Sequence, residues 1–428
     1  MMNTTEEKDE ASDLTVNNLI FVSPESLSLA VNRTANRQYF QRSTYQNGDT
    51  ARIDFNSGSD YIDPDNSYLT FSIKLNSPSV TPVTANFGCG SAMNCIKQVT
   101  LRSRSGCELD RCEYANVWSR IKTVNTESLA YLQTGGSLEG WDVGSLTNIG
   151  SRSYFVRSDS AYQVVLPLKR LSGFFEPVKR GQKLPACLFS GLTMELIFED
   201  YRTTVVVIDG DLGATVTGYT ISNISVMTDN TCLTDDTQKV LNSLSSSSGL
   251  EHTYNRVYTS INDLPSGTNT LSAQVRKAVS KAQYAVAVFL DPSFRTNITV
   301  DSFSSMGYTT TSYQWRLGSL YFPNQPLSDP DANGAEAFLA SLSTFNKLKN
   351  EHQEGSVTRA MFRTNYNGSL CGSFERDQEL NCSGLCINSS RVLELDCTFL
   401  NAIARQAFVF LSYAGVSRSY LDNTSVCI

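Results

Sequence analysis

The chain has 428 residues, of which 40% are hydrophobic and 18% are charged, and its formal net charge is −7. This length is enough for two domains of about 200 residues each, and the hydrophobic content excludes a chain that is disordered throughout. The acidic balance argues against direct binding of nucleic acid, because the longest basic cluster is the short segment 178–183. No run of about 20 apolar residues occurs that would predict a transmembrane helix.

The N-terminal segment 1–20 begins with an acidic stretch and lacks the apolar core of a signal peptide. We expect this segment to be a disordered arm. Without a secretion signal, the eleven cysteines are expected to be mostly reduced and buried.

Alternating apolar and polar residues predict antiparallel strands in the first half of the chain. In 67–75 every second side chain, from Leu69 to Leu75, is apolar, which is typical of a half-buried strand. The segment 63–66, Asp-Pro-Asp-Asn, predicts a turn before this strand, and Ser105-Gly106 predicts a hairpin turn after another. The further strands predicted here are 51–55, 96–103, 162–168, 192–200 and 219–227.

The pattern changes to a helical period in 113–121. The apolar residues there are Tyr114, Val117, Trp118 and Ile121, at i, i+3, i+4 and i+7. A similar stripe runs through 335–349 in the second half. We expect each helix to cover the end of a β-sandwich with its apolar stripe, including Trp118 and Phe338, and to turn its polar side towards neighbouring chains.

The run 240–252 contains four consecutive serines and a glycine, which indicates a flexible linker. It divides the chain into a first domain at 21–239 and a second at 253–428. The strands predicted in the second domain are 253–261, 280–290, 313–322, 391–399 and 407–416. The sequence thus predicts an all-β protein that repeats one unit, with one helix inserted at the same place in each copy.

Catalytic signals are weak. The chain has two histidines, His252 and His352, and neither has an obvious partner in the sequence. No nucleophile elbow, phosphate-binding loop or zinc-protease motif occurs, although a triad assembled in space stays open. We predict no catalytic centre, no cofactor and no metal site.

Three short motifs resemble parts of metal sites. The pairs Cys107/Cys112 and Cys382/Cys386 lie in different halves, so buried thiols or a loop disulfide explain them better than zinc. The run 329–334 imitates the start of an EF-hand loop, but its twelfth position is Ala340 instead of Glu. We expect a polar turn there, with Asp331 or Asn333 near the N-cap of the following helix.

The order of elements resembles that of the double jelly-roll major capsid proteins, the lineage of adenovirus hexon and of virophage, polinton-like virus and large DNA virus capsid proteins. The resemblance rests on the order and the duplication more than on any single motif. The stretches that carry it are 62–75, 96–118, 184–200 and 313–327, and 184–200 is expected to form a buried strand pair.

This resemblance implies two tandem eight-stranded jelly-roll sandwiches, each with a short inserted helix. It further implies a structural protein of an icosahedral DNA virus, which forms homotrimeric, pseudo-hexameric capsomers in the virion capsid after assembly inside the host cell. The implied partners are neighbouring capsomers, minor capsid and penton proteins, and an internal membrane reached through minor proteins. Charge reversals at Arg180 or Lys183 are expected to impair assembly and leave the fold intact.

Two alternatives of other kinds stay open. A single-jelly-roll capsid protein with a projecting domain usually carries a basic arm, whereas this arm contains Glu6, Glu7, Asp9, Glu10 and Asp13. A receptor-binding or carbohydrate-binding spike module could stack sugars on aromatic loop residues. The candidates for such stacking are Trp141, Tyr154, Phe155 and Trp315.

Overall fold

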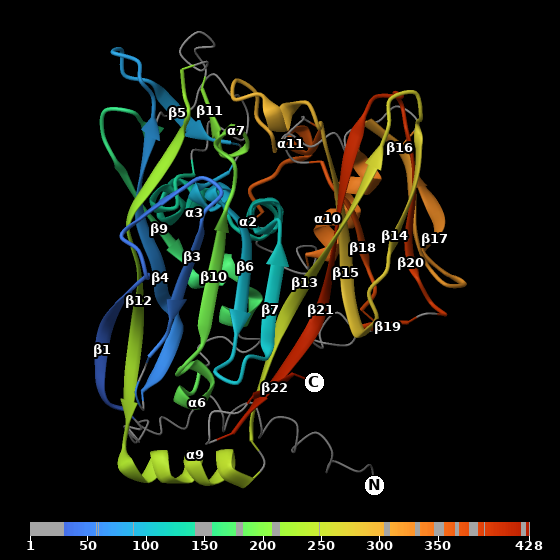
Figure 1. Cartoon of the computed structure of the whole chain (residues 1–428). Helices are drawn as coiled ribbons and strands as arrows, with labels where there is room; N and C mark the ends of the chain where they lie inside the picture. Colours follow the sequence, from blue (N-terminus) through green and yellow to red (C-terminus); the bar gives the residue numbers. More distant parts are fainter. Residues whose placement is uncertain are drawn as a thin grey trace, which may run out of the picture.

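The computed structural model describes residues 30–56, 58, 60–88, 90–141, 156–176, 183–207, 215–247, 249–303, 309–329, 334–345, 355–363, 368–375, 384–388, 390–420 and 425–427. These residues form upright antiparallel sheets in two bodies that stand side by side (Figure 1). Among them, no helix has the length and apolar character needed to cross a membrane. The proposed arm at 1–20 lies outside the described residues.

The first body is a sandwich of two sheets. One sheet has the order β1 (Ala30–Tyr39), β12 (Gly218–Leu233), β4 (Tyr61–Asn76), β9 (Tyr162–Pro167), with β2 (Thr44–Gln46) beside β12. The other has the order β3 (Thr50–Asp54), β10 (Thr193–Phe198), β6 (Ile96–Arg102), β7 (Glu108–Glu113). A small extra sheet is made of β11 (Val205–Val206), β5 (Thr84–Phe87) and β8 (Val156–Arg157).

The second body repeats this plan. One sheet has the order β13 (Leu250–Leu264), β21 (Arg405–Ser419), β15 (Val279–Leu290), β18 (Leu370–Ser373). Two short strands join it, β19 (Leu385–Ile387) beside β15 and β22 (Ser425–Cys427) beside β21. The other sheet has the order β14 (Thr270–Val275), β20 (Leu393–Phe399), β16 (Thr310–Leu317), β17 (Leu320–Ser328).

The two bodies share one strand topology. Without the short accessory strands, each has two paths of four strands, which can be numbered one to eight in chain order. In both bodies one sheet then reads 1-8-3-6 and the other 2-7-4-5. This is the jelly-roll arrangement, so the prediction of two tandem eight-stranded jelly rolls is confirmed. We call the bodies the first and second rolls.

The helices are short, and two of them occupy equivalent places. α2 (Ala115–Thr126) lies between the fifth and sixth strands of the first roll, and α10 (Ala335–Thr344) lies between those of the second. The other described helical segments are η1 (Ala92–Cys95), α3 (Leu129–Gln133), α4 (Gly135–Leu138), α5 (Leu168–Leu171), η4 (Gly173–Phe175), α6 (Ala186–Phe189), α7 (Tyr201–Thr204), α9 (Asp235–Ser247), η5 (Phe294–Thr296) and α11 (Arg359–Arg363).

The serine-rich run does not form the flexible linker that the sequence predicted. Residues up to Ser247 belong to helix α9, which lies across the base of the molecule, and β13 begins at Leu250 (Figure 1). Asp235 and Asp236 in its first turn suit the helix dipole. The hydroxyl of Ser245 is buried and donates to Cys187 Sγ at 3.8 Å. Docking against the first roll thus outweighs the weak helix propensity of serine.

The Asp-Pro-Asp-Asn segment does not precede its strand as a turn but lies inside β4. Asp63 pairs with Asp229 and Tyr68 pairs with Met227, so four residues of β4 bulge opposite one residue of β12. The Asp63 carboxylate accepts hydrogen bonds from Asp65 N at 3.1 Å and Asn66 Nδ2 at 3.2 Å. The turn chemistry is therefore real, but it stabilises a bulge in a longer strand.

Three other predicted segments differ in detail. Residues 108–113 form strand β7, joined to β6 by the predicted hairpin turn at Gly106, instead of leading straight into the helix. The run 313–322 is divided between β16 and β17, because the chain reverses at Gly318, which has φ +61°. Within 184–200, helix α6 precedes β10, so this stretch is not a strand pair.

Candidate functional site

Of the two histidines, the structure describes His252, and it packs in the core instead of joining a cluster of polar groups. His252 is buried, and its Nε2 donates a hydrogen bond to the backbone oxygen of Phe174 at 2.9 Å. Burial lowers the pKa of His252 below its ordinary value. Its ring stacks on Tyr254 with centroids 5.2 Å apart. His252 is therefore a packed residue of the seam between the rolls, and His352 lies outside the described residues.

The cysteine pairs do not assemble a metal site within the described residues. Cys107 and Cys112 are both reduced, and burial raises the pKa of the Cys112 thiol far above its usual range. Cys386 is an exposed free thiol, whereas Cys382 lies outside the described residues. The described chain contains no group of three or more His, Cys, Asp or Glu residues placed to hold a metal ion.

The segment that imitates an EF-hand start is a capped turn as far as the structure describes it. Asp329 follows β17, and its carboxylate accepts a hydrogen bond from the backbone N–H of Gly334, the N-cap residue of α10. Ala340 lies within α10. Asp331 and Asn333, which the sequence proposed as caps, lie outside the described residues.

Two of the four aromatic residues considered for sugar stacking are buried. Trp315 is fully buried between the sheets of the second roll, with its ring 6.3 Å from that of Phe374. Trp141 is also buried, and its indole N–H donates to Glu139 Oε2 at 3.3 Å. Neither ring is available to a ligand at the surface. Tyr154 and Phe155 lie outside the described residues.

The structural feature that can carry a function is the seam between the rolls. It is built on the outer face of the 1-8-3-6 sheet of the second roll, because β15 is apolar on both sides. Val286 and Val288 join the core of the first roll, while Ala287 and Phe289 face the core of their own roll. In β21, Phe408 and Phe410 likewise turn towards the first roll.

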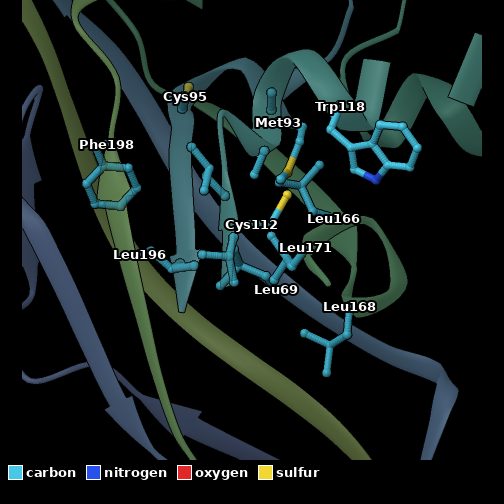
Figure 2. Close-up of a cluster of buried hydrophobic side chains, with 14 of the residues drawn as sticks. Leu69, Met93, Cys95, Cys112, Trp118, Leu166, Leu168, Leu171, Leu196 and Phe198 are labelled. Atoms are coloured by element: carbon cyan, nitrogen blue, oxygen red, sulfur yellow. The ribbon is translucent and has the colours of Figure 1, made fainter. Parts of the chain in front are cut away.

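The first roll covers this face with helix α2. The ring centroids of Trp118 and Phe410 are 5.5 Å apart, and those of Tyr114 and Phe408 are 5.0 Å apart. Figure 2 shows Trp118 beside the core of the first roll, where Met93, Cys112 and Leu166 come together. Nearly every residue of α2 is buried, including Asn116, Ser119 and Arg120. The sequence predicted that this helix covers a free sandwich end and turns its polar side towards a neighbouring chain. That prediction is wrong for α2, because its polar side is buried within the chain.

Helix α10 keeps part of its surface exposed. Its Phe338 packs on Phe362 of α11 with ring centroids 5.4 Å apart, while Leu339 is 54% exposed. Ser341 of α10 donates to Asn125 Oδ1 of α2 at 3.1 Å, which ties the two inserted helices together. The two helices thus have equivalent places but different environments.

Hydrogen bonds fix strand β13 against the edge strand β7. The Tyr254 hydroxyl donates to the Leu109 carbonyl at 2.6 Å, and the Thr259 hydroxyl donates to the Glu113 carbonyl at 2.7 Å. Edge strands expose unpaired backbone groups, and these two bonds satisfy carbonyl groups on β7. The approach is close at Gly173, where an added Cβ would lie 1.9 Å from Asn255 O.

A buried carboxylate lies in the same seam. Asp110 Oδ1 of β7 is 3.7 Å from Arg256 Nε of β13, and Asp110 Oδ2 accepts a hydrogen bond from the hydroxyl of Ser172. Burial raises the pKa of Asp110 to about 6, against the opposing effects of Ser172 and Arg256. The cavity beside Asp110 has a volume of about 90 Å³ and is lined by residues of both rolls, including Trp118 and Val257.

A second ion pair closes the seam further along. Arg295 Nη2 of the second roll is 3.4 Å from the buried Glu199 Oε2 of the first. The guanidinium also lies over the rings of Tyr114 and Phe408, at 5.5 and 5.4 Å from their centroids. Asn116 Nδ2 donates to the same Glu199 oxygen at 3.2 Å. The seam is thus apolar in its middle and charge-paired at its margins, which favours a fixed arrangement of the rolls.

Sequence reasoning did not find this seam, although a signal was present. A strand in an isolated sandwich alternates between a buried and a wet face, whereas 285–290 and 407–411 are apolar at every position. Such runs predict strands that are buried on both faces. The signal identifies the covered sheet, but it does not identify the element that covers it.

No protein-family model and no curated protein sequence matches the chain. Solved structures do match over nearly the whole length. The Faustovirus major capsid protein matches with a TM-score of 0.64 and 8% identity, covering 95% of this chain and 94% of that chain. VP54 of PBCV-1, fitted into a reconstruction of the virophage Sputnik, gives 0.63 and 11%, covering 92% and 96%. The mavirus major capsid protein gives 0.52 and 10%, covering 92% and 90%. The chain therefore has the tandem jelly-roll fold of these structures.

Proposed function

We propose that this chain is the major structural protein of an icosahedral viral capsid, in the lineage of DNA viruses with double jelly-roll capsid proteins. The observation that carries the proposal is the seam: two rolls of equal topology are locked into one upright block. The match to the Faustovirus and mavirus major capsid proteins supports it. Function then lies in surfaces that contact other copies, and we propose no catalytic activity.

We propose further that three copies form one capsomer. Two rolls of equal topology per chain give six similar units around a closed ring of three chains, which makes a pseudo-hexameric building block. Such a ring needs one kind of contact within the chain and a similar contact between chains. The contact within the chain is the seam between α2, β7 and the sheet that contains β13.

The single-roll alternative is not supported, because the second half of the chain is itself a jelly roll with the same strand order as the first. We keep the proposed division of the chain into 21–239 and 253–428. Its support is that β12 ends at Leu233 in one sheet and β13 begins at Leu250 in another. Helix α9 takes the place of most of the proposed linker at 240–252.

The proposed location is the virion capsid, after assembly in the host cell. The proposed partners are neighbouring capsomers, minor capsid and penton proteins, and an internal membrane contacted through minor proteins. The net charge of −7 supports a shell that does not bind the genome directly. Arg180 lies outside the described residues, whereas Lys183 Nζ lies 2.8 Å from Asp63 Oδ2 within the chain.

Light scattering coupled to gel filtration tests the proposal. We expect a particle with three times the 47.2 kDa mass of one chain, and flat pseudo-hexagonal particles in negative-stain images. A species that stays monomeric at every concentration, including under assembly conditions, would contradict the proposal. Isolated spikes in the images would favour the receptor-binding alternative instead.

A further inference from the structure

Each roll carries a groove between its fifth strand and its inserted helix. In the first roll the groove is lined by Cys112 of β7 and by Trp118 of α2, and Asn255 and Val257 of β13 close it. What remains is the cavity of about 90 Å³. The first strand of the second roll therefore fills the groove of the first roll.

The equivalent groove of the second roll is open. Its volume is about 520 Å³, and its described lining residues come from β17, α10 and β18, together with Glu375 two residues after β18. The apolar ones include Phe322, Pro323, Leu327 and Leu339. No strand of the described chain occupies it in the way that β13 occupies the groove of the first roll.

We propose that this open groove receives strand β1 of a second copy of the chain. Tyr39 of that strand would insert into the groove, and Arg37 would pair with a carboxylate of the groove. The inference rests on the proposed function and adds the surface by which copies meet. β1 is the counterpart of β13, because each is the first strand of its roll and pairs with the eighth. The contact within the chain then repeats between chains.

The side chains of β1 suit the groove. Tyr39 is 68% exposed, which is unusual for a large aromatic residue in a strand. In register it lies in one row with Ser225, Thr70 and Val165, on the outer side of its sheet. Arg37 is two residues away and lies on the same side. Exposed tyrosine and arginine are typical anchors of protein interfaces.

The charges of the two surfaces are complementary. Among the described residues that line the open groove, the ionisable ones are Glu336 and Glu375, and both are acidic. The hollow beside β1, of about 550 Å³, is lined by Arg37 and Arg42, and its described lining contains no acidic residue. Arg42 already lies 3.4 Å from Asp49 within its own chain, so Arg37 is the better partner for a groove carboxylate. The seam within the chain also pairs an acid with an arginine of the first strand, although its acid, Asp110, lies on the fifth strand and the groove acids lie on α10 and after β18.

The seam within the chain and the proposed contact between copies differ in chemistry. On the covered sheet one outward row contains Phe410, Val286 and Cys371, all buried. On the sheet that carries β1, the outward row of Tyr39 contains Ser225 and Thr70 besides Val165, and the hollow is also lined by Ser72 and Gln163. A polar and charged contact is weakened by salt more than an apolar one. Copies should therefore separate at high salt while the two rolls of each copy stay together.

A charge exchange tests the surface on the full-length chain. We expect Arg37→Glu or Glu336→Lys alone to raise the dissociation constant of the assembly at least about tenfold, because like charges then face each other. The double variant should restore most of the affinity. Glu336→Gln is the matched control, because it keeps an acceptor for the backbone N–H of Ser328, which Glu336 Oε2 binds at 2.9 Å. Melting curves of each variant show that the fold is intact. Single variants without effect, or a double variant weaker than both, would overturn the assignment.

Cysteine cross-linking gives a second measurement. We expect Tyr39→Cys with Leu339→Cys to form a disulfide between copies on mild oxidation, and Val80→Cys, on a fully exposed loop residue, with Leu339→Cys to form none. If the wild type assembles but neither the cross-link nor the charge exchange behaves as expected, the surface is wrong and the capsid proposal stands. If the wild type never leaves the monomer, both are wrong.

Discussion

The indole of Trp118 lies against the ring of Phe410 with centroids 5.5 Å apart, although the two residues are on different rolls. Both side chains are buried, and both belong to one continuous hydrophobic cluster that contains most of the first roll. The stability of the first roll and the docking of the second are therefore linked through the same contact. A change at either residue therefore affects the stability of the first roll as well as the docking of the second.

Replacing Trp118 with Ala should lower the free energy of unfolding by about 3–5 kcal/mol, because it leaves a cavity between the rolls. Guanidinium unfolding followed by circular dichroism measures this. The control is Val80→Ala, since Val80 is fully exposed and its loss should change stability by less than about 0.5 kcal/mol. Equal stability of the Trp118 variant and the wild type would contradict the role of the seam.

The strands that the sequence predicted best are those with one buried face and one solvent-exposed face. In 67–75 and 192–200 alternation is clear, and both are found in β4 and β10. Strand β1 was missed because its residues from Asn32 to Tyr39 are polar or small and mostly exposed, so no apolar alternation marks it. Its strand state comes from pairing with β12, which is a distant segment.

The candidate site was predictable only in part. The helix around Trp118 follows from its apolar stripe, but its Arg120 donates a hydrogen bond to the Phe303 carbonyl of the second roll, whose position no local pattern encodes. Asp110 illustrates the same limit. It reads as a polar residue of a turn in the sequence, and it becomes a buried carboxylate only because Arg256 and Ser172 approach from distant segments.

The pH dependence of stability should show the buried Asp110. Its pKa in the fold is about 6, above the ordinary value of 3.8, so the folded state favours the protonated form. The stabilisation from protonation is fully present below about pH 4 and is lost as the pH rises through about 6. The loss is about 2–3 kcal/mol at neutral pH.

Asp110→Asn should remove most of this dependence and raise the melting temperature at pH 7.5 relative to the wild type. Melting temperatures from pH 4 to 7.5 measure the effect, and Asp54→Asn on the half-exposed β3 carboxylate is the control. The wild-type and Asp110→Asn curves should converge towards pH 4. Parallel curves over the whole range would show that Asp110 does not titrate in this pH range.

The close approach of the rolls at Gly173 should make even a methyl group disruptive. A Cβ at this position would lie 1.9 Å from the backbone oxygen of Asn255, and a backbone atom cannot move aside as the end of a flexible side chain can. Gly173→Ala should therefore lower the melting temperature and increase proteolysis between the rolls. Gly355→Ala is the matched control, because a Cβ added there would lie 3.6 Å from Asn125 O, an ordinary contact distance. A Gly173 variant as stable as the Gly355 variant would mean that the rolls are not packed this closely.

The reactivity of the thiols should follow their burial. Cys95, Cys112 and Cys397 are buried, and burial raises the pKa of each thiol well above its usual range, so the reactive thiolate is suppressed. Cys386 is exposed. Brief alkylation of the native protein at pH 8, followed by peptide mass spectrometry, should modify Cys386 and leave these three unmodified until denaturant is added. Early modification of Cys112 would be the most informative exception, because this thiol lines the cavity between the rolls and its labelling would show that the seam opens in the native protein.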